Sequence, residues 1–201
     1  AIRRELATNE RVIEIPFAIR ALKVPRGSRV LDIGSRWSPL PLYLAALGYR
    51  TVATDLASFP LQGGGADFVC ADLTRPPFKA ESFDGAVMVS TLEHVGVGFY
   101  EKGTDPEADV ALMRALRLLL KPEGLLVFTV PFGRAGVGPV QRSYDGQRLR
   151  RVTDGWTWEE ARFHVRRGTA WEETTEAIAM REESKLQTHA VALVSLRRPW
   201  R

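Results

Sequence analysis

Three aspartates and one histidine of this chain follow strand-like apolar segments, the places where the side chains of a parallel sheet gather at one edge. The aspartates are Asp32, Asp55 and Asp72. The histidine is His94, which comes four residues after Ser90. A buried carboxylate is costly unless it binds something, so three in succession favour a ligand site over ordinary core packing.

The aspartates have the spacing of a nucleoside site. Asp55 stands 23 residues after Asp32, and an acid about 20 residues beyond the first turn commonly binds both hydroxyls of a ribose. Asp72 is suited to accept from the exocyclic amine of adenine, while Leu56 and Leu73 offer apolar contact to the ring. The alternative is structural: Asp55 caps a helix, and Asp72 caps a helix or forms an Asx-turn.

His94 is the candidate catalytic residue, a general base for an acceptor that must lose a proton. The alternative is a structural histidine bonded to neighbouring backbone. One cysteine and three histidines are too few for a Cys/His zinc cluster, so we expect no metal site. The lack of a Gly-x-Ser-x-Gly motif argues against a serine hydrolase.

The elements that position these residues alternate between strands and helices. Apolar runs predict strands at 29–34, 50–56, 67–71, 83–89, 125–130 and 190–196. Helical spacing and turn signals predict helices within 1–25, at 38–48 and at 106–120, with Pro16 kinking or dividing the first. This alternation predicts an α/β fold with a doubly wound, mostly parallel sheet. Ligands of such sheets bind beyond the carboxyl ends of the strands, where the aspartates and His94 stand.

An ordered set of motifs over about half of the chain resembles the class I S-adenosylmethionine-dependent methyltransferase superfamily. The motifs are Val30-Leu31-Asp32-Ile33-Gly34, Asp55, Ala71-Asp72-Leu73, Phe83-Asp84, Glu93-His94-Val95 and Leu120-Lys121-Pro122-Glu123-Gly124-Leu125. Within the superfamily, Trp37-Ser38-Pro39-Leu40-Pro41-Leu42 looks like a poorly characterised bacterial branch that acts on small molecules. The resemblance implies a Rossmann-like sheet of seven strands with the last strand antiparallel, and S-adenosylmethionine as the cofactor.

The resemblance also implies cofactor-binding residues. These are Asp32, Gly34 and Ser35 at the methionine end, Ser90 beside the sulfonium, Asp55 at the ribose, and Leu56, Asp72 and Leu73 at the adenine. The first loop departs from the family, because Arg36 stands where a glycine is common. Either Arg36 pairs with the carboxylate of the cofactor, or the loop is remodelled and cofactor binding is weak or absent.

The substrate side of the protein is expected to be basic. The net charge is +4, and the segment from 134 to 167 holds eight arginines and four acids, which accounts for the whole excess. Arg142 and Tyr144 in this segment, with Tyr100 in the glycine-bearing loop before it, are the candidate substrate-binding residues for an anionic or sugar-linked small molecule. The alternatives are RNA, with bases stacked on Trp156, Trp158 or Trp171, and a solvated cationic face.

At 201 residues, the chain is expected to be one methyltransferase domain. We assign 1–25 to an N-terminal helical cap, 26–133 to the cofactor-binding sheet, and 134–201 to the basic substrate-side region and final strands. No apolar run approaches the ~18 residues of a membrane helix, so we expect a cytoplasmic methyltransferase without a membrane partner. The alternatives are an RNA methyltransferase and a catalytically silent cofactor-binding or interaction domain. The acceptor, the atom methylated and the oligomeric state stay open.

Overall fold

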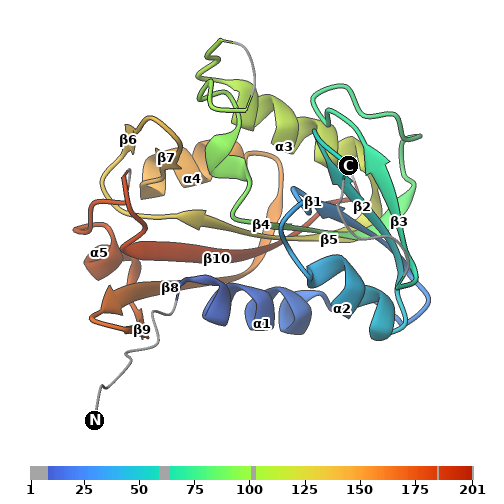
Figure 1. Cartoon of the computed structure of the whole chain (residues 1–201), viewed down its shortest axis with the longest axis horizontal. Helices are drawn as coiled ribbons and strands as arrows, with labels where there is room; N and C mark the ends of the chain where they lie inside the picture. Colours follow the sequence, from blue (N-terminus) through green and yellow to red (C-terminus); the bar gives the residue numbers. More distant parts are fainter. Residues whose placement is uncertain (1–8, 59–63, 101–102, 185, 201) are drawn as a thin grey trace.

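A computed structural model of the chain describes residues 9–58, 64–100, 103–184 and 186–200. Within these residues, eight strands form one sheet in the order β3-β2-β1-β4-β5-β10-β8-β9 (Figure 1). The strands are β1 (Arg29–Ile33), β2 (Arg50–Asp55), β3 (Ala66–Cys70), β4 (Phe83–Val89), β5 (Leu120–Pro131), β8 (Thr157–Arg167), β9 (Ala170–Thr174) and β10 (Ala190–Arg197). The first five are mutually parallel, and β10 is antiparallel to both of its neighbours.

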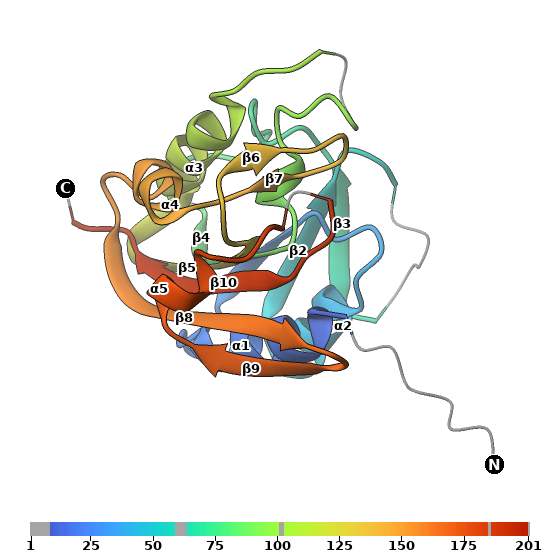
Figure 2. The ribbon, with the colours of Figure 1, turned by 90° about the vertical axis from the view of Figure 1, so that its left-hand side faces the viewer.

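The doubly wound, mostly parallel sheet is confirmed, but the predicted number of seven strands is wrong. The additional strand is β9, which pairs with β8 from Phe163 to Arg167 and extends the sheet beyond β10 (Figure 2). The sequence did not reveal this hairpin because both of its strands are largely exposed and rich in charged residues. They therefore lack the buried apolar run by which the other strands were recognised.

Helices cover both faces of the sheet. On one face lie α1 (Arg11–Ala21) and α2 (Leu40–Ala46), and on the other lie α3 (Ala108–Leu119) and α4 (Gly146–Val152) (Figure 1). Shorter elements complete the described chain: a 3₁₀ turn η1 (Leu92–His94), helix α5 (Glu176–Ala179) and a small pair of strands, β6 (Gly136–Val137) and β7 (Arg142–Ser143). The longest of the described helices is not long and apolar enough to cross a membrane.

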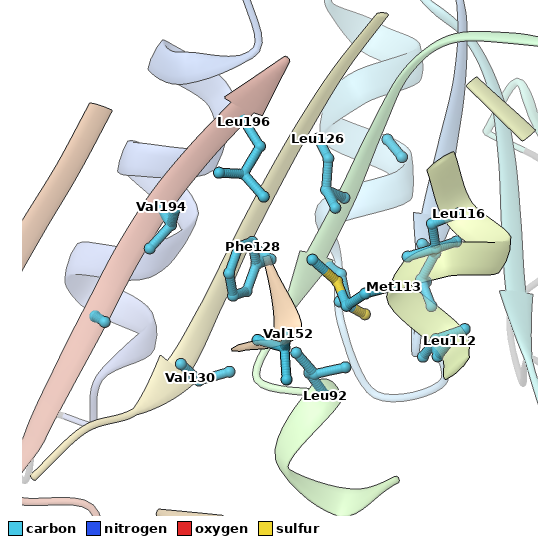
Figure 3. Close-up of a cluster of buried hydrophobic side chains, with 14 of the residues drawn as sticks. Leu92, Leu112, Met113, Leu116, Leu126, Phe128, Val130, Val152, Val194 and Leu196 are labelled. Atoms are coloured by element: carbon cyan, nitrogen blue, oxygen red, sulfur yellow. The ribbon is translucent and has the colours of Figure 1, made fainter. Parts of the chain in front are cut away.

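Each face of the sheet has its own apolar core. Leu31 of β1 packs with the buried side of α3, while Val30 points to the opposite face and packs with α1 and α2. Figure 3 shows side chains of α3, including Met113, gathered against Phe128 of β5. Because successive strand residues alternate between faces, Asp32 lies on the same face as Val30, toward α1. This alternation places a carboxylate beneath the N-terminal helix.

Two local predictions need correction. Pro16 lies inside α1 but does not divide it, since the helix runs unbroken from Arg11 to Ala21. The proline removes one backbone donor, and burial of Phe17 against the sheet stabilises the helix in compensation. Strand β5 begins at Leu120, five residues earlier than predicted, because Leu120 is already extended and pairs with Phe83.

Candidate functional site

A cleft of about 600 Å³ opens at the carboxyl ends of the parallel strands. It lies where the strand order reverses between β1 and β4, the position at which open α/β sheets bind their ligands. Most of the residues predicted to act together line this one cleft: Gly34, Arg36, Asp55, Leu56, Asp72, Leu73, Ser90, His94 and Tyr100. Four predicted residues, Asp32, Ser35, Arg142 and Tyr144, do not line it.

The first loop is held tightly against its neighbours at Gly34. This residue has φ +75°, and a Cβ built on it would lie 2.1 Å from Oγ1 of Thr91. Its N–H donates to the carbonyl oxygen of Thr54 at 2.8 Å. A residue with a side chain would meet both backbone strain and the Thr91 hydroxyl, so the loop can take this path only with glycine at position 34.

Arg36, which stands where the methyltransferase motif commonly has a glycine, lines the cleft. Its backbone N–H donates to Oδ2 of Asp55 at 3.1 Å, which ties the first loop to the end of β2. Its guanidinium lies 5.0 Å from the ring centroid of Trp37. The Nε atom is buried and has no hydrogen-bond partner among the described residues. Because Arg36 lines the cleft, its guanidinium is a candidate donor to an oxygen of a bound molecule.

Asp55 and Asp72 each contact nearby backbone N–H groups. Asp55 accepts from Ala57 at 3.2 Å as well as from Arg36. Asp72 uses one oxygen, Oδ1, to accept from both the backbone and the hydroxyl of Thr74, each at 2.8 Å. The structure therefore contains the Asx-turn of the alternative interpretation, yet Asp72 also lines the cleft. The turn orients the carboxylate rather than removing it from the site.

Asp32 and Ser35 lie behind the wall of the cleft. Ser35 is buried, and its N–H and hydroxyl both contact the carbonyl oxygen of Thr54, at 3.3 and 3.4 Å. Asp32 is 2% exposed, and its Oδ2 has no partner among the described residues. Burial raises the pKa of the Asp32 carboxyl to about 8, although the nearby guanidinium of Arg11 opposes the rise. Both residues are thus buried apart from the surface of the cleft.

Helix α1 contributes an acid to the site that the sequence interpretation missed. Glu14 is fully buried, and both of its carboxylate oxygens lie 2.9 Å from the hydroxyl of Ser90, which lines the cleft. Arg11 also lines the cleft and forms an ion pair with Glu14 at 3.3 Å. Burial raises the pKa of Glu14, and Arg11 partly offsets this effect. The available signal was the position of Glu14, one turn before Phe17 on the buried face of α1.

Ser90 is held in an unusual conformation at the centre of this arrangement. Its φ is +43°, a region that non-glycine residues rarely occupy. The hydroxyl donates to Glu14, and the backbone N–H donates to Oγ1 of Thr129 at 3.0 Å. Strained backbone of this kind persists where surrounding contacts enforce it and is concentrated at functional sites.

His94 lies on the wall of the cleft with a defined tautomer. Its Nδ1 is 2.6 Å from the carbonyl oxygen of Val140, and because a carbonyl only accepts, Nδ1 carries the proton. Its Nε2 is 3.9 Å from Oε1 of Glu93, a buried acid whose pKa is raised well above its usual range by burial. The ring of Tyr100 meets the imidazole edge to face at 5.4 Å. The contact with the Val140 carbonyl oxygen fits the structural interpretation of His94, and its role as a general base stays a prediction.

The predicted substrate contacts of Arg142 and Tyr144 need correction. Both residues are buried, and their polar atoms contact Asp109 of α3: Arg142 at 2.5 Å and the Tyr144 hydroxyl at 2.9 Å. They lie beside the cleft, because the hydroxyl of Tyr144 is also 3.2 Å from the carbonyl oxygen of Leu92. The guanidinium and the hydroxyl are thus already engaged and face the interior. Tyr100 is 60% exposed and does line the cleft.

The basic segment is largely neutralised by acids from elsewhere in the chain. Six of its eight arginines form ion pairs, and these are Arg142, Arg148, Arg150, Arg151, Arg162 and Arg167. Most of the acidic partners lie outside the segment, as with Glu107, Glu173 and Glu182. Trp156 belongs to the apolar core. A local excess of positive charge in the sequence therefore does not become a continuous basic surface.

Metal binding has no evident place in the described part of the chain, where no group of three or more His, Cys, Asp or Glu side chains is arranged to hold an ion. The polar groups of the cleft are instead those that suit an organic ligand: carboxylates, guanidinium groups, hydroxyls and an imidazole.

Solved structures of S-adenosylmethionine-dependent methyltransferases are similar to this chain. The Burkholderia thailandensis 1,6-didemethyltoxoflavin-N1-methyltransferase, with bound 1,6-didemethyltoxoflavin and S-adenosylhomocysteine, matches with a TM-score of 0.65 and 19% identity, covering 93% of this chain and 79% of that one. A methyltransferase from Methanosarcina mazei matches with a TM-score of 0.67 and 16% identity, covering 91% and 98%. The N-methyltransferase NodS from Bradyrhizobium japonicum, in complex with S-adenosylhomocysteine, matches with a TM-score of 0.62 and 17% identity, covering 94% and 87%. At these identities the likeness establishes the fold, which is the Rossmann-like methyltransferase fold.

The comparisons of sequence give a family. No curated protein matches the chain at a significant level. The family described as "Caenorhabditis protein of unknown function, DUF268" matches residues 75–197, more than half of the chain. The matched range begins after β3 and ends with β10, so it holds His94 and the contacts around it. The chain belongs to the DUF268 family.

Proposed function

We propose that this protein binds S-adenosylmethionine in the cleft and transfers its methyl group to a small-molecule acceptor. The observation that carries the proposal is the convergence of separate strand ends on one cleft: Gly34 after β1, Asp55 at the end of β2, Asp72 after β3 and Ser90 after β4. A site built only for packing has no need of the polar side chains at or just after the ends of β2, β3 and β4.

The side chains of the cleft suit the parts of this cofactor. Asp55 would bind the ribose hydroxyls, while Asp72 and Leu73 would contact the adenine. The guanidinium of Arg36 would donate to the methionine carboxylate, since Arg36 lines the cleft, and this position favours retained binding over the remodelled loop. Ser90 would border the sulfonium. S-adenosylmethionine supplies a methyl group that is already activated by positively charged sulfur, so the main tasks of the protein are alignment and exclusion of water.

His94 is suited to remove a proton from the acceptor. Because Nδ1 donates to Val140, the neutral imidazole presents Nε2 as its accepting nitrogen. His94 and Tyr100 line the same wall of the cleft, so an acceptor beside Tyr100 comes within reach of the imidazole. Proton removal is needed for a hydroxyl acceptor and for an ammonium acceptor.

A small molecule is favoured as acceptor over RNA by the ion pairs of the basic segment, which occupy six of its eight arginines. An anionic or sugar-linked acceptor remains our proposal, now with Arg11 and Tyr100 as the residues that would contact it, since both line the cleft. The three-part division of the chain, the cytoplasmic location and the bacterial small-molecule branch remain predictions from the sequence.

Calorimetric titration with S-adenosylhomocysteine tests the proposal. We expect binding by the unaltered protein and a loss of binding of at least tenfold in Asp55→Ala, the size expected when a charge-assisted hydrogen bond is removed. Asp154→Ala is the matched control, because Asp154 is exposed and lies outside the cleft. His94→Ala should retain nearly full affinity. Absence of binding at millimolar S-adenosylhomocysteine would overturn the proposed function and favour an interaction domain.

A further inference from the structure

A buried cluster centred on Asp109 lies beside the cleft. Asp109 is fully buried on α3 and accepts from two arginines, Arg142 at 2.5 Å and Arg148 through its Nε at 3.2 Å. The hydroxyl of Tyr144 lies 2.9 Å from Oδ2 of the same carboxylate. Asp109 belongs to α3, whereas its three partners come from the segment that contains β7 and the start of α4. The cluster therefore joins α3 to that segment.

This cluster contacts the backbone on both sides of His94. The Tyr144 hydroxyl shares its proton between Asp109 and the carbonyl oxygen of Leu92, which is 3.2 Å away. The Nη1 of Arg142 lies 3.5 Å from the carbonyl oxygen of Val95. Leu92 is two residues before His94, and Val95 is the next residue after it. The two carbonyl groups that flank the imidazole are therefore approached from the same short segment.

The same segment also contacts the imidazole itself. Val140 lies two residues before Arg142, and its carbonyl oxygen accepts from Nδ1 of His94 at 2.6 Å. Residues 140–144 thus contact the imidazole ring of His94 and the backbone on both sides of this residue. A shift of this segment relative to η1 would lengthen the Nδ1 contact, and the preference for the Nδ1–H tautomer would weaken.

We propose that Tyr144, Asp109 and Arg142 together position His94. They hold residues 140–144 against η1 and thereby keep the imidazole in the tautomer that has Nε2 as its acceptor. The inference rests on the proposed function, in which His94 takes a proton from the acceptor. It gives Arg142 and Tyr144, first predicted to contact substrate, a role one step behind the cleft.

Nitrogen-15 NMR of histidine-labelled protein tests the inference without any acceptor. Spectra recorded at alkaline pH, where imidazoles are neutral, separate the two tautomers, and His94→Asn identifies the His94 signals among the three histidines. We expect the Nδ1–H form to predominate in the unaltered protein. In Tyr144→Phe the tautomer ratio should shift toward Nε2–H by up to about tenfold, the change that loss of one hydrogen bond can produce.

Tyr49→Phe is the matched control. The Tyr49 hydroxyl also contacts two backbone carbonyl oxygens, those of Leu22 and Val24 at 3.4 Å each, but it lies outside the cleft. Its loss should leave the His94 tautomers unchanged. If Tyr144→Phe and Tyr49→Phe give the same tautomer ratio as the unaltered protein, Tyr144 only stabilises the fold and the positioning role is wrong.

A second pair of variants decides the question if Tyr144→Phe does not fold. Arg142→Lys keeps a positive charge beside Asp109 and should retain the Nδ1–H form, whereas Arg142→Met should lose it. Equal ratios in the two variants would contradict the inference. Titration of the same samples with S-adenosylhomocysteine separates the two proposals, because failure of the unaltered protein to bind overturns the proposed function, while the tautomer ratios alone decide the positioning role.

Discussion

The Glu14 carboxylate on the first helix accepts the hydrogen bond of the Ser90 hydroxyl at 2.9 Å and so connects α1 to the wall of the cleft. The contact joins residues that are 76 positions apart in the sequence. Glu14 also forms the ion pair with Arg11 that holds the guanidinium at the cleft. The N-terminal helix is therefore part of the site, and its polar residues determine the charge at one end of the cleft.

Replacement of Glu14 by alanine should destabilise the protein by about 1–3 kcal/mol, because the Ser90 hydroxyl and the Arg11 guanidinium would both lose their acceptor. Urea denaturation at neutral pH measures the change. Glu14→Gln, which retains an acceptor for Ser90, should cost less than Glu14→Ala. Glu172→Ala on the exposed face of β9 is the control, and a cost for Glu14→Ala no larger than that control would show that the contact contributes little.

Replacement of Gly34 by alanine should destabilise the protein more than the same change at Gly27. Both residues have positive φ, +75° and +83°, so each variant bears about 1–2 kcal/mol of backbone strain. Only at Gly34 would the added Cβ overlap Thr91, since nothing lies within 4 Å of a Cβ at Gly27. Thermal unfolding measures both changes. Equal losses of stability would mean that the loop moves away from Thr91 without an energetic cost. Gly34→Ala should also weaken S-adenosylhomocysteine binding.

The sequence predicted the parts of the fold that depend on local patterns. Strands β1, β2, β3 and β4 were expected within about one residue of their observed bounds, because each is a short apolar run that ends at a polar residue or glycine. The β8–β9 hairpin was missed because its charged residues are paired across strands and helices, as in the ion pair of Arg20 with Glu160. Such pairs have no periodic signal along the chain.

The residues of the site likewise divide into those that a local rule predicts and those whose place depends on packing. Asp55 and Asp72 were found because a parallel sheet brings successive strand ends together, a rule that operates on sequence order alone. Glu14 and Arg11 were missed because their place over the sheet depends on how α1 docks. Arg142 and Tyr144 were assigned to substrate because their residue types suit it, yet the buried carboxylate of Asp109 already satisfies them. Residue type indicates what a side chain can bind, and packing decides what it does bind.

The titration of Asp32 should make the protein less stable as pH rises. Its pKa is about 8 in the folded protein and near 3.8 in the unfolded chain, so between these values the unfolded chain binds fewer protons than the folded one. Stability from this group is therefore complete below about pH 4 and falls toward pH 8, with a slope of at most about 1.4 kcal/mol per pH unit.

Asp32→Asn should flatten this part of the pH dependence, because asparagine does not titrate. Urea denaturation between pH 5 and pH 8 would give the slope of stability against pH for the two proteins. This interval lies roughly between the pKa of Asp32 in the unfolded chain and its pKa in the folded protein. Burial also raises the pKa of Glu14 and Glu93, so a smaller slope of the same sign should remain in Asp32→Asn. Parallel slopes would show that Asp32 stays ionised in the folded protein.

RNA binding by the basic segment should be weak and non-specific. A gel shift with single-stranded RNA across a salt series measures it, because binding through phosphates weakens steeply as salt rises. We expect no shift at physiological salt. Tight binding with a steep salt dependence would mean that arginines such as Arg150 and Arg162, both partly exposed, exchange their acidic partners for phosphates.

Removal of Asp109 should destabilise the protein far more than removal of Glu107, although both acids lie at the start of α3 and both pair with Arg148. The Asp109 side chain is 0% exposed and that of Arg142 is 6% exposed, so Asp109→Ala leaves a buried guanidinium without its partner, at a cost of about 3–5 kcal/mol. Glu107 is 48% exposed, so water and salt screen its ion pairs and their loss should cost much less than the loss of Asp109. Urea denaturation of the two variants compares them directly. A cost for Asp109→Ala close to that of Glu107→Ala would mean that Arg142 finds another acceptor, such as the Val95 carbonyl oxygen 3.5 Å away, and that the segment from 140 to 144 is held against η1 mainly by its apolar contacts.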